Sequence, residues 1–440
     1  METLATRTFT MADQQRFAER SGDYNPIHID SVAARRTLAG QCIVHGTHAV
    51  LWALDELKQT PSHLKVKFLK PVHVDETVTL LRDNNRLFIM AGDIKLVDIA
   101  FEAGADLPAF NVQTPMPAAE PNVLTIGQMA GRSGELPLTG SSALAADLMA
   151  LSRLVGMECP GLQSMFSAFD VAIASSARTT LTYAVTDVDE RFSRITIDVT
   201  GVCISGTLDA FVRPAPAAVA DMKAIAAQVN PGEFAGQRAL VIGGSRGLGE
   251  VTAKILAAGG AHVTITYAAS VDDANRVAAV IRDHGGACDV MQYTVPGNVS
   301  QLPAATQVYY FATPKIFGKR GTGEDAQRLA AFRAMYVQGF EDIFRAQKSA
   351  VFFYPSSIAI EQPLAELAEY ITAKTEGEAL CSTLSTTTIL ISRLPRTATD
   401  QTQALVAAPA ADPLAVMLPL VRDMQTRISV LQSAPETRTA

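Results

Sequence analysis

A glycine-rich turn, Gly-Gly-Ser-Arg-Gly-Leu-Gly at residues 243–249, is the sequence feature that most narrows the folds open to this chain. It follows a short apolar run at residues 239–242 and precedes an alanine-rich segment predicted to be helical from Glu250 to Ala258. A further strand is predicted at Val263–Tyr267. Because strand, turn, helix and strand in this order form a βαβ unit, the pattern predicts a doubly wound parallel sheet.

The turn has the properties of a phosphate-binding loop. Glycines permit a tight turn and the close approach of a pyrophosphate, whose charge then faces backbone N–H groups at the positive end of the helix. A glycine-rich loop without a ligand is the alternative, but the position between a strand and a helix favours a dinucleotide. The predicted cofactor-binding residues are Gly243, Ser245, Arg246, Gly247, Leu248 and Gly249.

The end of the second strand bears on the choice between NAD(H) and NADP(H). Enzymes that use NAD place an acidic residue there to bind the ribose 2′-hydroxyl. In this chain the position lies near residues 267–269, Tyr-Ala-Ala, and the next carboxylates are Asp272 and Asp273. NADP(H) is favoured over NAD(H) because the Arg246 guanidinium could pair with a 2′-phosphate; a solvated loop cation is the alternative role for Arg246.

Tyr370 and Lys374 form a Tyr-x-x-x-Lys pair in a segment of helical composition, so they lie one turn apart on one helix face. Ser357 follows an apolar run, residues 350–354, that is predicted to be another strand of the sheet. A lysine ammonium beside a tyrosine stabilises the phenolate, so Tyr370 can exchange a proton while Ser357 hydrogen-bonds a carbonyl oxygen. For an isolated pair of this spacing, a surface contact is the alternative.

Together these residues resemble the short-chain dehydrogenase/reductase family. The resemblance implies hydride transfer between NADP(H) and a carbonyl or alcohol, with Tyr370 as the acid/base, Lys374 on the nicotinamide ribose and Ser357 orienting the substrate. Three segments depart from the family pattern: Tyr310-Phe311-Ala312-Thr313 stands for Asn-Asn-Ala-Gly, Tyr336 for the relay asparagine, and Pro395-Arg396 for Pro-Gly. A domain that binds the cofactor but is only weakly active therefore stays open.

The N-terminal part carries a second candidate site. Residues 21–28 read Ser-Gly-Asp-Tyr-Asn-Pro-Ile-His, which predicts a loop that holds Asp23 and His28. An acid and a histidine that share one water can add it to, or remove it from, a double bond next to a carbonyl. Gly46 begins an apolar helix predicted to end at Leu57, so its N–H could bind an enolate-like oxygen. A capping Asp23 and a structural His28 are the alternative roles.

The full string from Ser21 to Ala34 resembles the MaoC-like, (R)-specific hydratase/dehydratase family, whose Ser-Gly-Asp-x-Asn-Pro-aliphatic-His signature it matches without a departure. The resemblance implies a hotdog fold with Asp23 and His28 as the catalytic dyad. It also implies Asn25 as a positioning residue and Gly46 as the oxyanion donor. The implied substrates are 3-hydroxyacyl or trans-2-enoyl thioesters of coenzyme A or acyl carrier protein.

The middle of the chain repeats the helix-then-strands pattern but contains no histidine. It resembles a degenerate second hotdog, with Glu158 as the acid near its expected turn, that completes the pocket of the first. Strands are predicted at Leu64–Phe68, Val72–Leu81 and Leu87–Phe101, and then at Thr180–Thr186, Ser193–Thr200 and Gly206–Val212; helices are predicted at Met11–Arg20 and Ser141–Val155.

The predicted fold class is an α+β double hotdog followed by an α/β Rossmann-like doubly wound parallel sheet. The predicted boundaries are 1–116 for the first hotdog, 117–216 for the second, 217–236 for a linker and 237–440 for the nucleotide-binding domain. Prolines at 115, 117 and 121 and at 214 and 216 mark the two seams.

Composition restricts the partners and the compartment. The chain has 37 Lys+Arg against 44 Asp+Glu, a net charge of -7, so it lacks the basic surplus that nucleic-acid binding requires. Its 5 cysteines lie far apart, which is typical of free thiols in the cytoplasm. No segment has the character of a signal peptide or a membrane span, and the histidines show no metal-ligand spacing, so neither a membrane nor a metal is predicted.

The two predicted chemistries share a metabolite, because reduction of a 3-oxoacyl thioester yields the 3-hydroxyacyl thioester that dehydration consumes. We therefore expect a bifunctional cytoplasmic enzyme that acts on acyl-CoA or acyl carrier protein thioesters, as a homo-oligomer. One alternative is a thioester-binding hotdog with a degenerate reductase domain used for assembly. The other keeps the N-terminal activity, with the reductase half acting on an unrelated carbonyl such as a nucleotide-sugar ketone.

Overall fold

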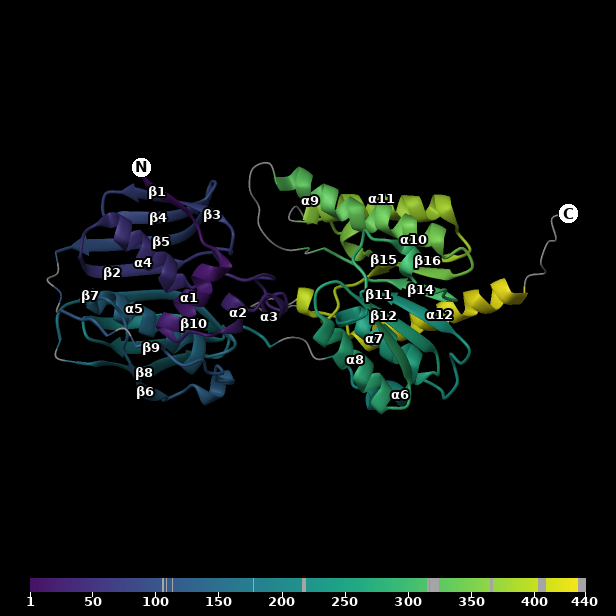
Figure 1. Cartoon of the computed structure of the whole chain (residues 1–440), viewed down its shortest axis with the longest axis horizontal. Coiled ribbons are helices and arrows are strands. Elements are labelled where there is room, and N and C mark those ends of the chain that lie inside the picture. The colour runs from purple at the N-terminus through teal and green to yellow at the C-terminus, as the bar shows by residue number, and fades with distance from the viewer. Residues whose placement is uncertain are drawn as a thin grey trace. The chain divides into compact units, whose positions relative to one another are not determined.

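The computed structural model divides the chain into two compact units, with the boundary between Ala215 and Pro216 (Figure 1). It describes residues 1–433 except 105–106, 108, 113, 177, 216–218, 315, 317–323, 365–366 and 403–408. Each unit has its own sheet and its own hydrophobic core. None of the helices within these ranges combines the length and apolarity that crossing a membrane requires.

The first unit is built on one ten-stranded antiparallel, hotdog-like sheet. The strand order is β1 (Glu2–Thr8), β3 (Thr77–Asp83), β4 (Arg86–Ala91), β5 (Ile94–Ala103), β2 (Pro61–Phe68), β7 (Ser164–Ile173), β10 (Ile204–Val212), β9 (Arg194–Thr200), β8 (Thr180–Asp189) and β6 (Ser133–Pro137). In this order the last strand of the first half is β2. It pairs with β7 of the second half, and Val66 lies opposite Phe169. The seam predicted at residues 116 and 117 thus lies within a unit whose strands form a single sheet.

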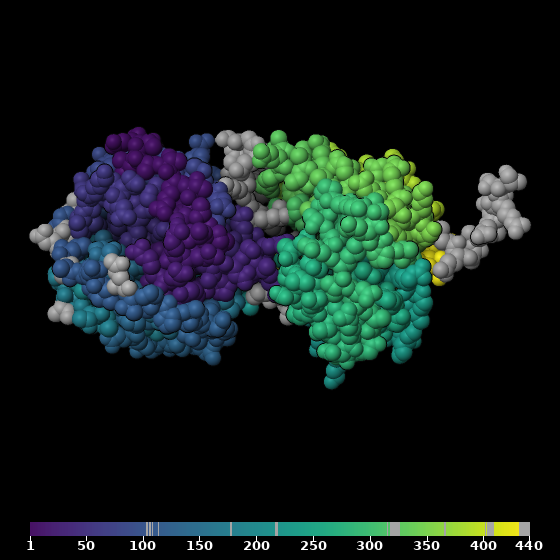
Figure 2. Space-filling model, viewed as in Figure 1, coloured from purple at the N-terminus to yellow at the C-terminus, as the bar shows by residue number. Residues whose placement is uncertain are grey.

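The helices of this unit are α1 (Met11–Ser21), α2 (Pro26–Ile29), α3 (Ser31–Ala34), α4 (Gly46–Leu57) and α5 (Ala143–Arg153), which continues as the π-turn η2 (Leu154–Glu158); η1 is a short turn at Ile126–Gln128. Helices α4 and α5 contact each other, and the residues of both halves form one core that includes Trp52, Leu148 and Phe169. Figure 2 shows the purple first half and the blue second half adjoining on the surface of this unit.

Several strand predictions need correction. The stretch Leu87–Phe101 is a hairpin, β4 and β5, because Gly92 adopts a φ of 54° and reverses the chain. The strand predicted at Val72–Leu81 begins only at Thr77, after Asp75 at a φ of 62°. Strands β1, β6 and β7 lie outside the predicted elements. Turns that depend on the conformation of a single glycine or aspartate were thus harder to predict than strands that show an apolar alternation.

The second unit is a six-stranded parallel, Rossmann-like sheet in the order β13 (Ala287–Gln292), β12 (His262–Tyr267), β11 (Arg238–Ile242), β14 (Gln307–Tyr310), β15 (Val351–Ser357) and β16 (Ile389–Leu394). The order reverses direction between β11 and β14. Ligands of such sheets bind at this switch point, beyond the carboxyl ends of the strands. The predicted glycine-rich turn directly follows β11.

Helices cover both faces of this sheet (Figure 1). One group comprises α6 (Met222–Ala226), α7 (Gly247–Ala258), α8 (Val271–Asp283) and α12 (Pro413–Ser433); the other comprises α9 (Glu324–Arg333), the π-helical segment η4 (Ala334–Gly339), α10 (Phe340–Ala346) and α11 (Ala368–Leu384). Short turns lie at η3 (Val299–Gln301), η5 (Ile358–Ile360) and η7 (Asp400–Thr402).

The region predicted as a linker, 217–236, is folded from Met222 onward. Residues 217 and 218 lie outside the described residues, but Met222, Ile225 and Phe234 are buried in the core of the second unit. A Cβ atom on Gly259 would lie 2.2 Å from the Phe234 ring, so this segment packs closely on the end of α7. Most of the predicted linker therefore belongs to the second unit.

Candidate active sites

Asp23 is held inside the first unit by residues of both halves. Gly22 ends α1 in the left-handed conformation, with a φ of 75°, and turns the chain so that Asp23 is only 1% exposed. Ser152 Oγ of α5 donates to Asp23 Oδ2 at 2.7 Å, and the Asn25 N–H donates to Oδ1 at 3.2 Å. Burial raises the pKa of Asp23, whereas His28, Ser152 and the Asn25 N–H oppose this rise.

His28 lies in the short helix α2, so the prediction that it lies in a loop is wrong. Pro26 suits the first helical position, and Asn25 caps the helix by accepting from the Ile27 N–H at 3.2 Å. His28 Nδ1 lies 2.9 Å from the Ile43 carbonyl oxygen, which can only accept, so the neutral ring leaves its lone pair on Nε2. Burial lowers the pKa of His28, and the Asp23 charge partly offsets that shift.

A third residue, His45, completes the cluster. One side-chain atom each of Asp23, His28 and His45 lies within 4.8 Å of the others. The His45 ring stacks on His28 with centroids 3.9 Å apart, and its nitrogens lie 2.9 Å from Gln14 Oε1 and 3.0 Å from the Asp23 main-chain oxygen. Both ring nitrogens of His45 thus lie against oxygens of the protein itself, and the neutral ring can donate to only one of these oxygens. The cluster is therefore suited to acid–base chemistry, and the absence of a metal stays a prediction.

Two glycines bring backbone close to this site. Gly46 is the first residue of α4, so its N–H has no intrahelical acceptor, as an oxyanion donor requires. A Cβ atom there would lie 2.8 Å from the Phe68 ring, and a Cβ atom on Gly156 would lie 2.2 Å from Asp23 Oδ1. Asn25 Nδ2 donates to the Gly156 carbonyl oxygen at 2.9 Å, which fits the implied positioning role.

Ser152 and Gly156 belong to the site, although no motif in the sequence predicted them. The one signal for Ser152 is its hydroxyl among the buried residues of the helix, which are apolar apart from Ser152 and Asp147. Glu158, the acid singled out in the second half, instead accepts from Asn122 Nδ2 at 3.3 Å. The second half thus contributes a serine and a close backbone approach to Asp23.

In the second unit the glycine-rich turn has the shape of a cradle. Gly243 and Gly247 adopt left-handed φ values of 81° and 57°, and the Gly243 N–H donates to Thr266 Oγ1 at 3.0 Å. A Cβ atom on Gly249 would lie 2.2 Å from the Gly243 carbonyl oxygen, whereas one on Gly247 would meet nothing closer than 3.8 Å. The turn is therefore tight on its inner side and open on its outer side, which fits a pyrophosphate at the start of α7.

Ser357, Tyr370 and Lys374 come together at the carboxyl end of the same sheet. Ser357 is the last residue of β15, and Tyr370 and Lys374 lie on α11. Burial raises the pKa of Tyr370, and a hydrogen bond with the Ser357 side chain opposes the rise. Lys374 Nζ donates to the Pro355 carbonyl oxygen at 2.6 Å, and burial lowers its pKa to about 7. The three residues thus have the mutual placement that proton transfer needs.

The residues at the three departures from the family pattern make different contacts. Thr313 and Tyr336 bond to each other, with Oγ1 and OH 2.5 Å apart. Arg396 instead donates from its guanidinium to the Thr402 carbonyl oxygen.

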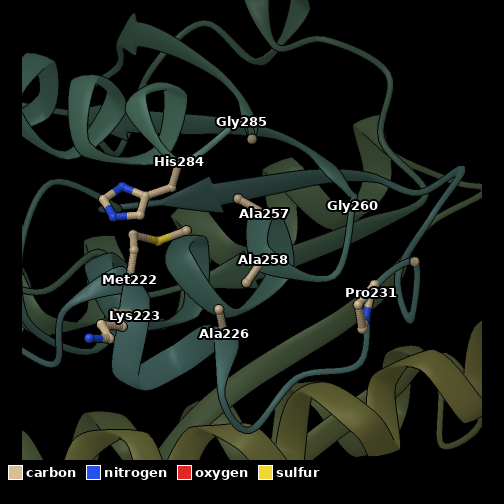
Figure 3. Close-up of a pocket in the computed structure, with 11 residues that line it drawn as sticks. Met222, Lys223, Ala226, Pro231, Ala257, Ala258, Gly260, His284 and Gly285 are labelled. Carbon is tan, nitrogen blue, oxygen red and sulfur yellow. The ribbon is translucent and has the colours of Figure 1, made fainter.

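A surface hollow of the second unit lies away from these residues (Figure 3). Its lining includes Met222, Lys223 and Ala258, and also Gly260 and Gly285, which precede β12 and β13. It therefore lies at the amino ends of the strands, opposite the edge where such sheets bind nucleotides.

No curated protein matches the chain by sequence. Among solved structures, a short chain dehydrogenase/reductase family protein is 20% identical over 44% of this chain and 93% of its own, with a TM-score of 0.39. The 3-oxoacyl (acyl-carrier-protein) reductase from Agrobacterium tumefaciens with NADP bound is 19% identical over 39% and 74%, with a TM-score of 0.35. The FolM alternative dihydrofolate reductase 1 from Brucella canis complexed with NADP is 18% identical over 38% and 74%, with a TM-score of 0.33.

These structural likenesses are too distant to carry a functional argument, so the assignment of the second unit rests on its own residues. The first unit also matches a known family. The family model of the MaoC like domain matches residues 1–85 of this chain, a region that includes Asp23, Asn25, His28 and Gly46.

Proposed function

We propose that the chain is a bifunctional acyl-thioester enzyme. Its first unit would be an (R)-3-hydroxyacyl-CoA or acyl carrier protein dehydratase that also hydrates enoyl thioesters. Its second unit would be an NADP(H)-dependent 3-oxoacyl reductase. The observation that carries the proposal is the cluster of Asp23 with the unprotonated Nε2 of His28, in a region that matches the MaoC like domain.

The dyad accounts for the reversible addition of water. In hydration, His28 Nε2 accepts a proton from a water held beside Asp23 while the water oxygen bonds to C3 of the enoyl thioester. The electrons move to the thioester oxygen, where the Gly46 N–H would stabilise the enolate, and C2 then takes a proton from the dyad. The contacts of Ser152 and Gly156 with the Asp23 region support a double hotdog in which the second half completes one site.

The reductase residues divide the work at a carbonyl. A bound nicotinamide nucleotide would supply or accept the hydride, with its pyrophosphate at Gly243–Gly249 and Arg246 near a 2′-phosphate. Tyr370 donates its hydroxyl proton to the carbonyl oxygen, which Ser357 orients by a hydrogen bond. The Lys374 ammonium stabilises the resulting phenolate. Cytoplasmic location and a homo-oligomeric state stay predictions.

A crossed pair of variants tests the proposal. With crotonyl-CoA, Asp23→Asn should reduce the loss of enoyl absorbance at least about a hundredfold and leave NADPH oxidation with acetoacetyl-CoA intact. Tyr370→Phe should do the reverse. If the wild-type protein catalyses neither reaction, a thioester-binding module without turnover is favoured. If it only hydrates, the second unit reduces another carbonyl or none.

A further inference from the structure

The ammonium of Lys374 lies against tyrosine rings. Its Nζ is 3.8 Å from the centroid of Tyr336, 5.0 Å from that of Tyr354 and 6.0 Å from that of Tyr370. Lys374 is 5% exposed, so this contact is largely desolvated. Cations are attracted to aromatic faces within about 6 Å, and the attraction grows when water is excluded. The Tyr336 ring is the nearest and therefore the strongest of the three partners.

The Tyr336 ring is fixed from several sides. Its hydroxyl bonds to Thr313 Oγ1, which follows β14, and its main-chain oxygen accepts from Tyr354 OH at 3.1 Å. Phe332, one turn earlier on α9, stacks on it with centroids 5.7 Å apart and an interplanar angle of 9°. Tyr336 is only 1% exposed, in the π-helical segment η4. The ring therefore cannot turn away from Lys374 without breaking its contacts with Thr313 and Phe332.

We propose that Tyr336 is a positioning residue that holds the Lys374 ammonium over its ring and thereby keeps it charged beside Tyr370. The inference rests on the reductase half of the proposed function. An aromatic face attracts a cation but does not accept its proton, so Lys374 acts here as a fixed charge. The paired departures Tyr336 and Thr313 then form one device, in which the Thr313 hydroxyl anchors the ring that supports the lysine.

The charge of Lys374 needs such support. Burial lowers its pKa to about 7, and the groups that favour the charged form are Cys381 and Glu378 on its own helix. Glu378 is already engaged, since it accepts from Arg393 at 2.7 Å and from the Ser356 hydroxyl. From the neighbouring elements, the groups that face the ammonium are the ring of Tyr336 on η4, the ring of Tyr354 on β15, and the Pro355 carbonyl oxygen of β15, which accepts from Nζ at 2.6 Å. The Tyr336 ring is thus the group on η4 that stabilises the charged form of Lys374.

A direct test measures the protonation of Lys374 in the whole protein without any substrate. Acetic anhydride labels only the neutral amine, so the labelling of the Lys374 peptide against pH, followed by mass spectrometry, gives a midpoint. Tyr336→Leu should lower this midpoint by about one pH unit. Tyr336→Phe keeps the ring and should leave it nearly unchanged. Phe344→Leu is the control, since it removes a ring of the same unit that contacts Phe340 and Phe352 and none of the three Lys374 partners.

The outcomes separate this inference from the proposed function. An unchanged or raised midpoint in Tyr336→Leu would overturn the inference, and so would an equal shift in Phe344→Leu, which would reflect loosened packing. In an active enzyme, the alkaline limb of NADPH oxidation should move with the midpoint in Tyr336→Leu only. If the wild-type protein oxidises no NADPH, the reductase assignment fails, while the labelling result still decides whether Tyr336 holds Lys374.

Discussion

Gly156 offers a sharp test of how the second half of the first unit serves Asp23. This glycine has no positive φ, so alanine is compatible with the backbone at this position. The obstacle is space, because an added Cβ atom would lie 2.2 Å from Asp23 Oδ1 and 2.7 Å from its Cγ. Carbon and oxygen atoms in contact normally stay more than about 3.2 Å apart. Gly156→Ala must therefore displace the carboxylate, or the π-turn that carries residue 156, by about 1 Å.

A displacement of this size is large for a catalytic group. Misplacement by about 1 Å can reduce a rate about a hundredfold, so we expect that loss in the hydration of crotonyl-CoA. The crowding should also lower the free energy of unfolding by about 1–3 kcal/mol. NADPH oxidation by the second unit should not change, since Gly156 belongs to the first.

The assay compares Gly156→Ala with Gly127→Ala, because a Cβ atom on Gly127 would meet nothing within 4 Å. Both proteins are followed by the loss of enoyl absorbance at concentrations of crotonyl-CoA that separate kcat from KM. Circular dichroism and thermal unfolding verify that each variant is folded. A folded Gly156→Ala protein that hydrates crotonyl-CoA within about threefold of the Gly127→Ala control would refute the role of Asp23 placement argued from the structure.

Three further changes probe other parts of the molecule. Ser152→Ala removes a hydrogen bond that lowers the pKa of Asp23, so this pKa should rise. Because the carboxylate is the form present above the pKa, the acidic limb of the hydration pH profile should move to higher pH by about one unit. Asp147 is buried and accepts from the N–H groups of Val202, Cys203 and Ile204. Asp147→Ala should therefore lower the free energy of unfolding measured in urea by about 3–5 kcal/mol. A decrease below about 1 kcal/mol would contradict a stabilising role for these hydrogen bonds. Arg246→Ala should weaken NADPH binding about tenfold in a fluorescence titration and leave NADH binding nearly unchanged, whereas an equal loss for both would argue against a 2′-phosphate contact.

Local sequence signals predicted the elements that carry chemistry. The helix Gly46–Leu57 has the predicted bounds, because its initial glycine and its apolar residues lie within one short stretch of sequence. The turn at 243–249, the pair Tyr370 and Lys374, and the string from Asp23 to His28 are equally local. Contacts between distant segments were not predictable in this way. Ser152 meets Asp23 across 129 positions, and nothing near either residue indicates the other.

The same limit explains the linker. Alanine and proline between 214 and 231 indicate a connection, but Phe234 is buried because it meets Gly259 at the far end of α7. Similarly, Thr313 and Tyr336 are separate departures in the sequence and become one hydrogen-bonded pair only in the fold. Packing partners, rather than element types, are what the sequence left undetermined.

The pairing of β2 with β7, which places both halves of the first unit in one sheet, has a consequence for how the protein can change over time. In an assembly of two identical chains, every substitution would occur twice and alter both copies of a site. Here each half mutates on its own. The second half can lack a histidine altogether and still supply Ser152 and Gly156, while the first half keeps Asp23 and His28. Covalent joining thus allows one half to specialise in chemistry and the other in support, an asymmetry that a symmetric dimer cannot encode.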